Sequence, residues 1–143
     1  MKKLLLGSVL MLSSASAQAK EYNVDYVTCY DGDTCTFDFH LGFGIKSRQS
    51  IRWCDVDTPE IRPLKTRKRA TEARDYVRNL LIKAKRIVVD IQFKKNCVGA
   101  YCEADTFGRP LGYVYADGIN LNELLLDKGV GVLDDKTCKE YRR

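Results

Sequence analysis

The sequence has only one histidine, His40, and no two of its six cysteines are spaced as CxxC. A zinc site of cysteine and histidine ligands therefore has few candidate ligands. His40 belongs to a predicted hairpin strand, remote from the acidic motifs described below, so we expect it to be a surface residue and not a catalytic base. The longest apolar run, residues 4–12, is too short to span a bilayer.

Residues 1–19 have the composition of a secretory signal and not of a folded domain. Two lysines precede the apolar run, and the small residues that follow it end in Ala17-Gln18-Ala19, a typical A-x-A cleavage pattern. We expect cleavage after Ala19, with Ala17 as the alternative, and export to the periplasm or out of the cell. Residues 20–143 have the length of one domain. We expect a monomer with no stable membrane association.

All six cysteines lie in the predicted mature chain: Cys29, Cys35, Cys54, Cys97, Cys102 and Cys138. An even number in an exported protein predicts disulfides. Cys97 and Cys102 lie within one short loop, and we predict that they pair with each other. The spacing leaves the partners of the other four open.

The charge of the mature chain is mild but unevenly distributed. Without Lys2 and Lys3, 22 basic and 19 acidic residues give a net charge of +3. Five positive charges fall within the eight residues of 62–69, at Arg62, Lys65, Arg67, Lys68 and Arg69. This run has two interpretations: a solvated loop and helix start, or an electrostatic rim for a polyanion.

The pattern of apolar residues predicts a mainly β domain with helices (α+β). Strands are predicted at 22–30, 34–41, 48–56, 87–93 and 111–115. A helix is predicted over 69–85, after an irregular basic loop at 61–68, and Asn120 is predicted to cap a short helix that runs through Lys128 and ends at Gly129. Three strands, a helix and two further strands fit a five-stranded barrel of the OB type.

Three charged segments are candidates for chemistry. DGDT at 31–34 suits a hairpin turn, and it does not fit an EF-hand because glycine is its second residue. IRWCDVDTPE at 51–60 ends in Thr58-Pro59, which restricts the backbone where a strand gives way to a turn. DTFGRP at 105–110 holds an arginine between glycine and proline. Each segment alone also fits an ordinary surface turn.

Together, the segments supply the groups needed to cleave a phosphodiester. Asp33 and Asp57 can offer oxygen ligands to a hard divalent cation. Glu60 can accept a proton from an attacking water, or orient it. Arg52 and Arg109 can donate forked hydrogen bonds to a phosphate as charge develops.

The order of the motifs is more specific than any one of them. DGDT (31–34), IRWCDVDTPE (51–60), the amphipathic helix, FGRPLGYVYADG (107–118) and NLNELLLDKG (120–129) together resemble the staphylococcal nuclease-like (thermonuclease) family. The resemblance extends from about Tyr22 to Gly131. It implies an OB-fold, Ca²⁺-dependent nuclease that acts on DNA and RNA with low sequence specificity and leaves 3′-phosphate ends.

The resemblance also implies roles for individual residues. Asp33 and Asp57 match the calcium-binding aspartates, with the backbone carbonyl of Thr58 as a further ligand; Arg52 and Arg109 match the catalytic arginines, and Glu60 matches the general base. Tyr113 and Tyr115 fall at aromatic strand positions near the nucleotide pocket, although alternating tyrosines also suit any strand. Asp55 has no counterpart, and we expect a surface carboxylate on the opposite side of the strand end.

The sequence departs from the family pattern at several positions. Thr106 and Phe107 replace a lysine and a tyrosine of the best-known member, which bears on affinity and end preference, and Pro110 replaces a glycine. The chain stops at Arg143, where the founding member continues into a long helix. Disulfides can supply the missing stability, and we hypothesise that Cys138 tethers the tail to the barrel.

Two other functions are compatible with the fold class. One is a non-catalytic OB module that binds nucleic acid, since a fold can keep its groove and lose its catalytic groups. The other is a disulfide-rich exported protein that binds another protein. The complete set of two aspartates, one glutamate and two arginines favours the nuclease, because binding alone does not need it.

Overall fold

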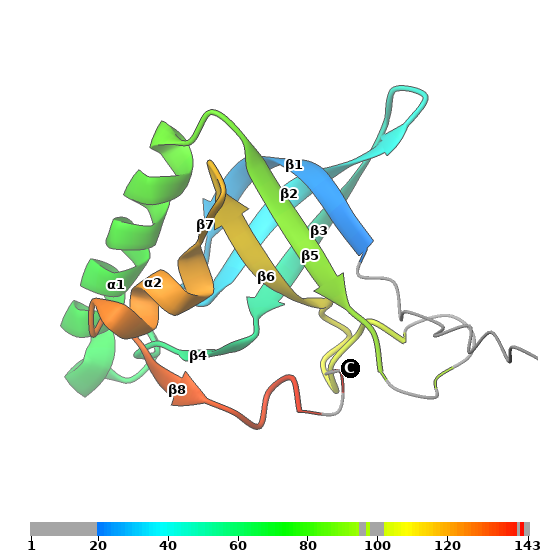
Figure 1. The fold of residues 1–143 in the computed structure, drawn as a ribbon. Coiled ribbons are helices and arrows are strands. Elements are labelled where there is room, and N and C mark those ends of the chain that lie inside the picture. The colour runs from blue at the N-terminus through cyan, green and yellow to red at the C-terminus, as the bar shows by residue number, and fades with distance from the viewer. Residues whose placement is uncertain (1–19, 95–96, 98–101, 140, 142–143) are drawn as a thin grey trace, which may run out of the picture.

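The computed structural model describes residues 20–94, 97, 102–139 and 141, so the predicted signal segment lies outside the described residues. Its centre is a closed barrel (Figure 1). The barrel strands are β1 (Lys20–Cys29), β2 (Thr34–Gly42), β3 (Ile45–Trp53), β5 (Ile87–Gln92) and β6 (Leu111–Ala116). Neighbouring strands are antiparallel, except that β3 and β6 pair in parallel and close the sheet. The predicted five-stranded OB-type barrel is confirmed.

The remaining elements lie to one side of this barrel (Figure 1). They are α1 (Leu64–Lys83), α2 (Leu121–Asp127), the short strand β7 (Ile119–Asn120) beside β6, and a two-stranded ladder of β4 (Asp55–Asp57) and β8 (Val132–Asp134). Asn120 caps α2 as predicted, because its side chain accepts hydrogen bonds from two backbone N–H groups of the first turn. Gly129, with φ +67°, ends the α2 segment in the left-handed conformation.

Helix α1 begins at Leu64, so the predicted irregular loop is wrong for residues 64–68. Pro63 occupies the N-cap with φ −66°, a value already suited to a helix start. The carbonyl of Pro63 accepts hydrogen bonds from the N–H groups of Thr66 and Arg67, each at 3.1 Å. The first turn carries no acidic residue. The usual charge signal for a helix N-terminus is therefore absent, so the sequence pattern does not indicate that α1 begins at Leu64.

The core fixes the end of β3, where the functional residues gather. Ile51 and Trp53 are fully buried, and they pack in one cluster with Val89 of β5, Val114 of β6 and Val77 of α1. Full burial of an aliphatic or aromatic side chain typically contributes about 1.5–3 kcal/mol. Because Ile51 and Trp53 are fixed in the core, the side chain of Arg52 between them and those of the residues just after Trp53 are held in a fixed direction.

All six cysteines form disulfides: Cys29–Cys35, Cys54–Cys138 and Cys97–Cys102. The predicted Cys97–Cys102 pair is confirmed, and so is the tether from Cys138 to the barrel. Cys54–Cys138 joins residues 84 apart in sequence. In the chain-entropy model, closing a loop of that length stabilises the fold by about 4–5 kcal/mol.

Within the described residues, no helix is both long and apolar enough to cross a membrane.

Candidate active site

Three segments that are distant in sequence meet where β3 ends. In the parallel pair of β3 and β6, Arg52 lies opposite Leu111. The backbone N–H of Arg52 donates to the carbonyl of Pro110 at 3.0 Å, and that of Trp53 donates to the carbonyl of Asp33 at 2.8 Å. The end of β3 is therefore flanked on one side by the DGDT turn and on the other by the loop that carries the second arginine.

The DGDT turn is closed by the Cys29–Cys35 disulfide and clamped onto Thr58. Asp33 is buried, and its Oδ2 accepts hydrogen bonds from the N–H (2.7 Å) and the hydroxyl (3.0 Å) of Thr58. A Cβ on Gly32 would lie 2.8 Å from Cγ2 of Thr58, so only glycine allows this close approach. Asp33 and Thr58, predicted to act together, are thus in direct contact.

Arg52 is nearly buried, with 11% of its side chain exposed, and carboxylate and carbonyl oxygens surround it. Nη1 lies 2.9 Å from Oδ1 of Asp33 and donates to the carbonyl of Val56 at 2.8 Å. Nη2 lies 3.3 Å from Oδ1 of Asp57 and 3.7 Å from Oδ2 of Asp134. The structure therefore brings together three of the predicted charged residues: Asp33, Arg52 and Asp57.

Glu60 follows the Thr58-Pro59 turn, and its side chain is exposed. Its backbone carbonyl accepts a hydrogen bond from the hydroxyl of Thr66 at 2.8 Å, which ties it to the first turn of α1. Glu60 borders two hollows. One contains Asp57 and Thr58, and the other, of about 450 Å³, is lined by Tyr30, Asp31, Glu60, Ile61, Arg62, Phe107 and Arg109. Glu60 thus lies between the aspartates and the second arginine.

Arg109 is oriented by Asp105, a residue for which the sequence motifs predict no role. Nε and Nη2 of Arg109 lie 3.0 and 2.9 Å from Oδ2 of Asp105. The other oxygen of Asp105 accepts hydrogen bonds from the backbone N–H groups of Arg109 (2.9 Å) and Phe107 (2.8 Å). The guanidinium carbon lies 5.3 Å from the ring centre of the exposed Phe107. Because its side chain remains 34% exposed, Arg109 can also contact a ligand in the hollow.

A family model described as staphylococcal nuclease homologue matches residues 50–142, which is more than half of the chain. The chain belongs to this family. The family membership indicates a nuclease-like function on nucleic acid. The matched region contains Arg52, Asp57, Glu60 and Arg109, whereas Asp33 precedes it and is placed beside Arg52 by the fold. A search of curated proteins gave no match.

The carboxylates of this nuclease-family site lie close enough to affect one another. Burial and the negative charge of Asp33 raise the pKa of Asp31 to about 7. Burial, followed by the charge of Asp33, also raises the pKa of Asp57. Carboxylates that resist ionisation because of like-charged neighbours favour a cation beside them.

The donor set fits the calcium that members of the staphylococcal nuclease family generally use. Among the residues that the structure describes, no three histidine, cysteine, aspartate or glutamate side chains form a metal-binding group. The predicted set does not need three, because it consists of the carboxylates of Asp33 and Asp57 and the carbonyl of Thr58. All three are hard oxygen ligands, the type that Ca²⁺ prefers.

The raised pKa of Asp31 predicts a pH-dependent effect of Asp31→Asn on stability. In the folded protein the pKa of Asp31 is about 7, so it keeps its proton up to that pH, whereas in the unfolded chain it ionises near the ordinary value of 3.8. Ionised Asp31 therefore destabilises the fold increasingly as pH rises from about 4 to 7. In chelator, we expect Asp31→Asn to stabilise the protein by about 2–4 kcal/mol more at pH 8 than at pH 4. Urea unfolding at both pH values measures this, and an equal effect at both would contradict it.

The structure does not bring Tyr113 and Tyr115 into the charged site. They line a separate hollow of about 410 Å³ together with Asp55, Asp90, Gln92, Asn120, Asn122, Glu123, Leu126 and Leu133. Their predicted contact with nucleotide therefore has no support from the geometry. His40 is a surface residue, as expected, and its Nε2 lies 2.8 Å from a carboxylate oxygen of Asp25.

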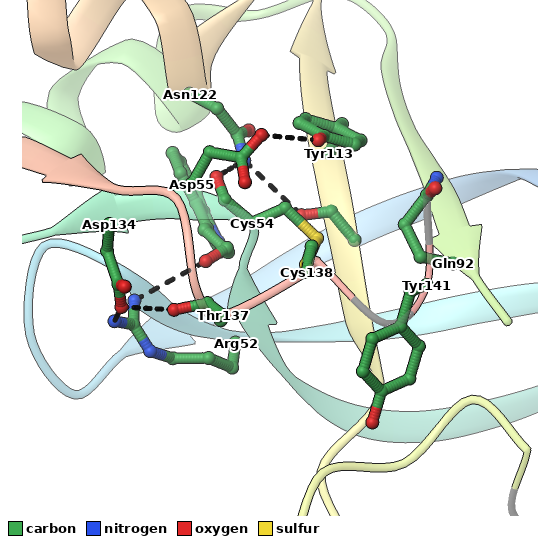
Figure 2. The surroundings of a disulfide bond; sticks show 12 residues. Arg52, Cys54, Asp55, Gln92, Tyr113, Asn122, Asp134, Thr137, Cys138 and Tyr141 are labelled. Carbon is green, nitrogen blue, oxygen red and sulfur yellow. Dashed lines mark hydrogen bonds and ion pairs between the residues drawn. A yellow bond between two sulfur atoms is a disulfide. The ribbon is translucent and has the colours of Figure 1, made fainter. Parts of the chain in front are cut away.

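The expectation that Asp55 is a surface carboxylate is wrong. Asp55 has a φ of +64°, which interrupts the strand between β3 and β4 and turns its side chain toward β6. The hydroxyl of Tyr113 donates to Oδ2 of Asp55 at 2.6 Å, and the residue is partly buried (Figure 2). Asp55 lines the hollow of Tyr113 and Tyr115 and is not among the carboxylates paired with Arg52, so it stays outside the charged site.

Proposed function

We propose that this protein is an exported, Ca²⁺-dependent nuclease that hydrolyses phosphodiester bonds of DNA and RNA with low sequence specificity and leaves 3′-phosphate ends. One observation carries the proposal. The end of β3 gathers the family's charged residues from three segments, with Asp33, Arg52 and Asp57 in direct contact and Glu60 beside Arg109 in one hollow. Nucleic-acid binding alone does not require two aspartates, a glutamate and two oriented arginines.

In this proposal Asp33, Asp57 and the carbonyl of Thr58 hold the metal. A bound Ca²⁺ supplies positive charge to a phosphate oxygen and a coordination position for water. The clamp between Asp33 and Thr58 keeps two of the three ligands in place before any cation binds. A preformed ligand set lowers the ordering cost of binding.

The chain's own side chains carry the proton and the developing charge. Glu60 accepts a proton from the water that attacks phosphorus. Arg52 and Arg109 donate hydrogen bonds to phosphate oxygens that gain negative charge in the pentacoordinate transition state. The bond from phosphorus to the 5′ oxygen breaks, the 5′ oxygen takes up a proton, and the phosphate stays on the 3′ oxygen.

The surroundings suit a polyanion without a defined sequence. Arg62 lines one hollow and Arg69 lines the other, and the basic residues between them in the first turns of α1 are exposed. Basic side chains that face phosphates supply affinity but no base readout, which gives binding that depends on salt and not on sequence. Of the two interpretations of the basic run, an electrostatic rim is therefore the one that we propose.

Export is supported by the cysteines. Disulfides persist in oxidising compartments and are rare in the cytosol. This protein has three, and two of them fasten segments of the site: Cys29–Cys35 closes the DGDT turn, and Cys54–Cys138 joins the end of β3 to the tail.

Incubation with nucleic acid tests the proposed activity and its metal. We expect the purified protein, without the predicted signal, to cleave single- and double-stranded DNA and RNA in Ca²⁺ and to lose this activity in excess chelator. End-group analysis of the fragments should show 3′-phosphates. Full cleavage in chelator would contradict the metal role of Asp33 and Asp57, and binding without cleavage would favour the non-catalytic OB module.

A further inference from the structure

The chain after α2 returns to the charged site. Strand β8 pairs with β4 so that Val132 lies opposite Asp57 and Asp134 lies opposite Asp55. A few residues later, Cys138 is bonded to Cys54, two positions after Arg52 (Figure 2). The segment of residues 132–138 is thereby fixed at two points next to the strand end that carries the site.

This segment places a third carboxylate on Arg52. Oδ2 of Asp134 lies 3.7 Å from Nη2 of Arg52, and Figure 2 shows the two side chains facing each other. Asp134 is itself held in position, because it accepts hydrogen bonds from the hydroxyl of Thr137 and from the backbone N–H of Lys136. Its orientation toward Arg52 is therefore built into the turn that leads to Cys138.

The two terminal nitrogens of Arg52 differ in what holds them. Nη1 is fixed by the carbonyl of Val56 and by the carboxylate of Asp33. Nη2 is held by Asp57 and Asp134. In the proposed function Asp57 is a metal ligand, so its oxygens are shared with the cation. Asp134 is then the carboxylate that remains dedicated to Nη2.

We propose that Asp134 is a positioning residue for Arg52, and that the Cys54–Cys138 disulfide acts on catalysis by keeping Asp134 within reach of the guanidinium. This inference rests on the proposed function. The tail is thus part of the machinery that orients the first arginine, in addition to its contribution to stability.

The test compares Asp134→Asn with Asp135→Asn. Asp135 is the exposed neighbour, and its replacement changes the net charge by the same amount, so it controls for the general attraction of a polyanion. Asp134→Asn should lower kcat by about tenfold with little change in KM or Tm, as loss of an outer partner of a reactive group typically does. Asp134→Glu should recover part of the rate, and Asp135→Asn should behave as wild type.

A second readout does not depend on activity. With Ca²⁺ in excess, so that the oxygens of Asp57 are shared with the cation, the Nε–H resonance of Arg52 should be sharp in wild type and Asp135→Asn, and broadened by motion in Asp134→Asn. If wild type fails to cleave nucleic acid, the proposed function is wrong, whereas this resonance still reports whether Asp134 holds Arg52. The inference would be overturned if Asp134→Asn had the same kcat and the same Arg52 resonance as Asp135→Asn. It would also be overturned if Asp134→Asn had a higher kcat than wild type.

A double-mutant cycle that combines loss of the disulfide with loss of the Asp134 carboxylate tests the part played by the disulfide. Replacing Cys54 and Cys138 with serine should lower kcat. Adding Asp134→Asn to that variant should lower kcat by a much smaller factor than it does in wild type, because without the disulfide Asp134 is no longer held near Arg52. Equal costs in both backgrounds would show that the disulfide does not act through Asp134. If the serine variant fails to fold, the single Asp134 variants and the resonance of Arg52 decide the main claim.

Discussion

Replacing Glu60 with glutamine is expected to lower kcat by about 10²–10⁴-fold, the range that a positioned general base contributes. Glutamine has nearly the same shape but cannot take the proton of the attacking water. The side chain of Glu60 is exposed, and the bond that ties this residue to α1 uses its backbone carbonyl. The fold should therefore be unaffected, with Tm unchanged. Initial rates on a short labelled oligonucleotide, measured at saturating Ca²⁺ and substrate, give the change in kcat.

Glu72→Gln is the matched control for this variant. Glu72 is an exposed glutamate on α1, so its replacement removes the same charge outside the hollow shared by Glu60 and Arg109. It should keep the wild-type rate. A Glu60→Gln variant that retains more than half of the wild-type kcat would exclude Glu60 as the base.

Replacing Arg109 with alanine is expected to lower kcat by about 10²–10³-fold, the cost of removing one preorganised donor to a developing oxyanion. Arg109→Lys should recover little, because an ammonium cannot reproduce a planar fork that contacts Asp105 and a phosphate together. Asp105→Asn should show a smaller loss, since it weakens the orientation of the guanidinium without removing it. The same oligonucleotide assay compares the three variants.

Arg48→Ala provides the control for the loss of one positive charge. Arg48 is exposed on β3 near the hairpin and is paired with Asp38, away from the site. Its replacement should leave kcat unchanged. If Arg109→Ala raised only KM and left kcat intact, Arg109 would contribute ordinary substrate binding and not transition-state stabilisation.

The barrel could be predicted from the sequence because its strands alternate clearly and its turns carry strong local signals. Asp31-Gly32 marks one hairpin turn, and Asn120 and Gly129 mark the two ends of α2. The start of α1 was missed because Pro63 makes a helix start without the usual acidic first turn. Strand β8 was missed because three residues carry too little periodicity, and only pairing with β4 gives them an extended structure.

The candidate site was predictable to the extent that local motifs define it. Asp33, Arg52, Asp57, Glu60 and Arg109 each lie in a motif, and the structure places them at one end of the barrel. Three further carboxylates were not given roles: Asp31, Asp105 and Asp134. Their roles depend on tertiary contacts, namely burial beside Asp33, the fork onto Arg109 and the register of β8.

The same dependence on tertiary structure explains the error at Asp55. Its left-handed backbone turns the side chain toward Tyr113, and no local pattern indicates a positive φ at an aspartate that begins a strand one residue after another strand ends.

The central claim is that charged residues from separate segments act as one catalytic unit, and the double variant Glu60→Gln/Arg109→Ala tests it most directly. Residues that act as one unit on the reacting phosphate are strongly non-additive, because the contribution of each requires the other to be in place. We predict a kcat for the double variant close to that of the slower single variant. A fall equal to the product of the two single effects, or a wild-type rate in either single variant, would contradict the account.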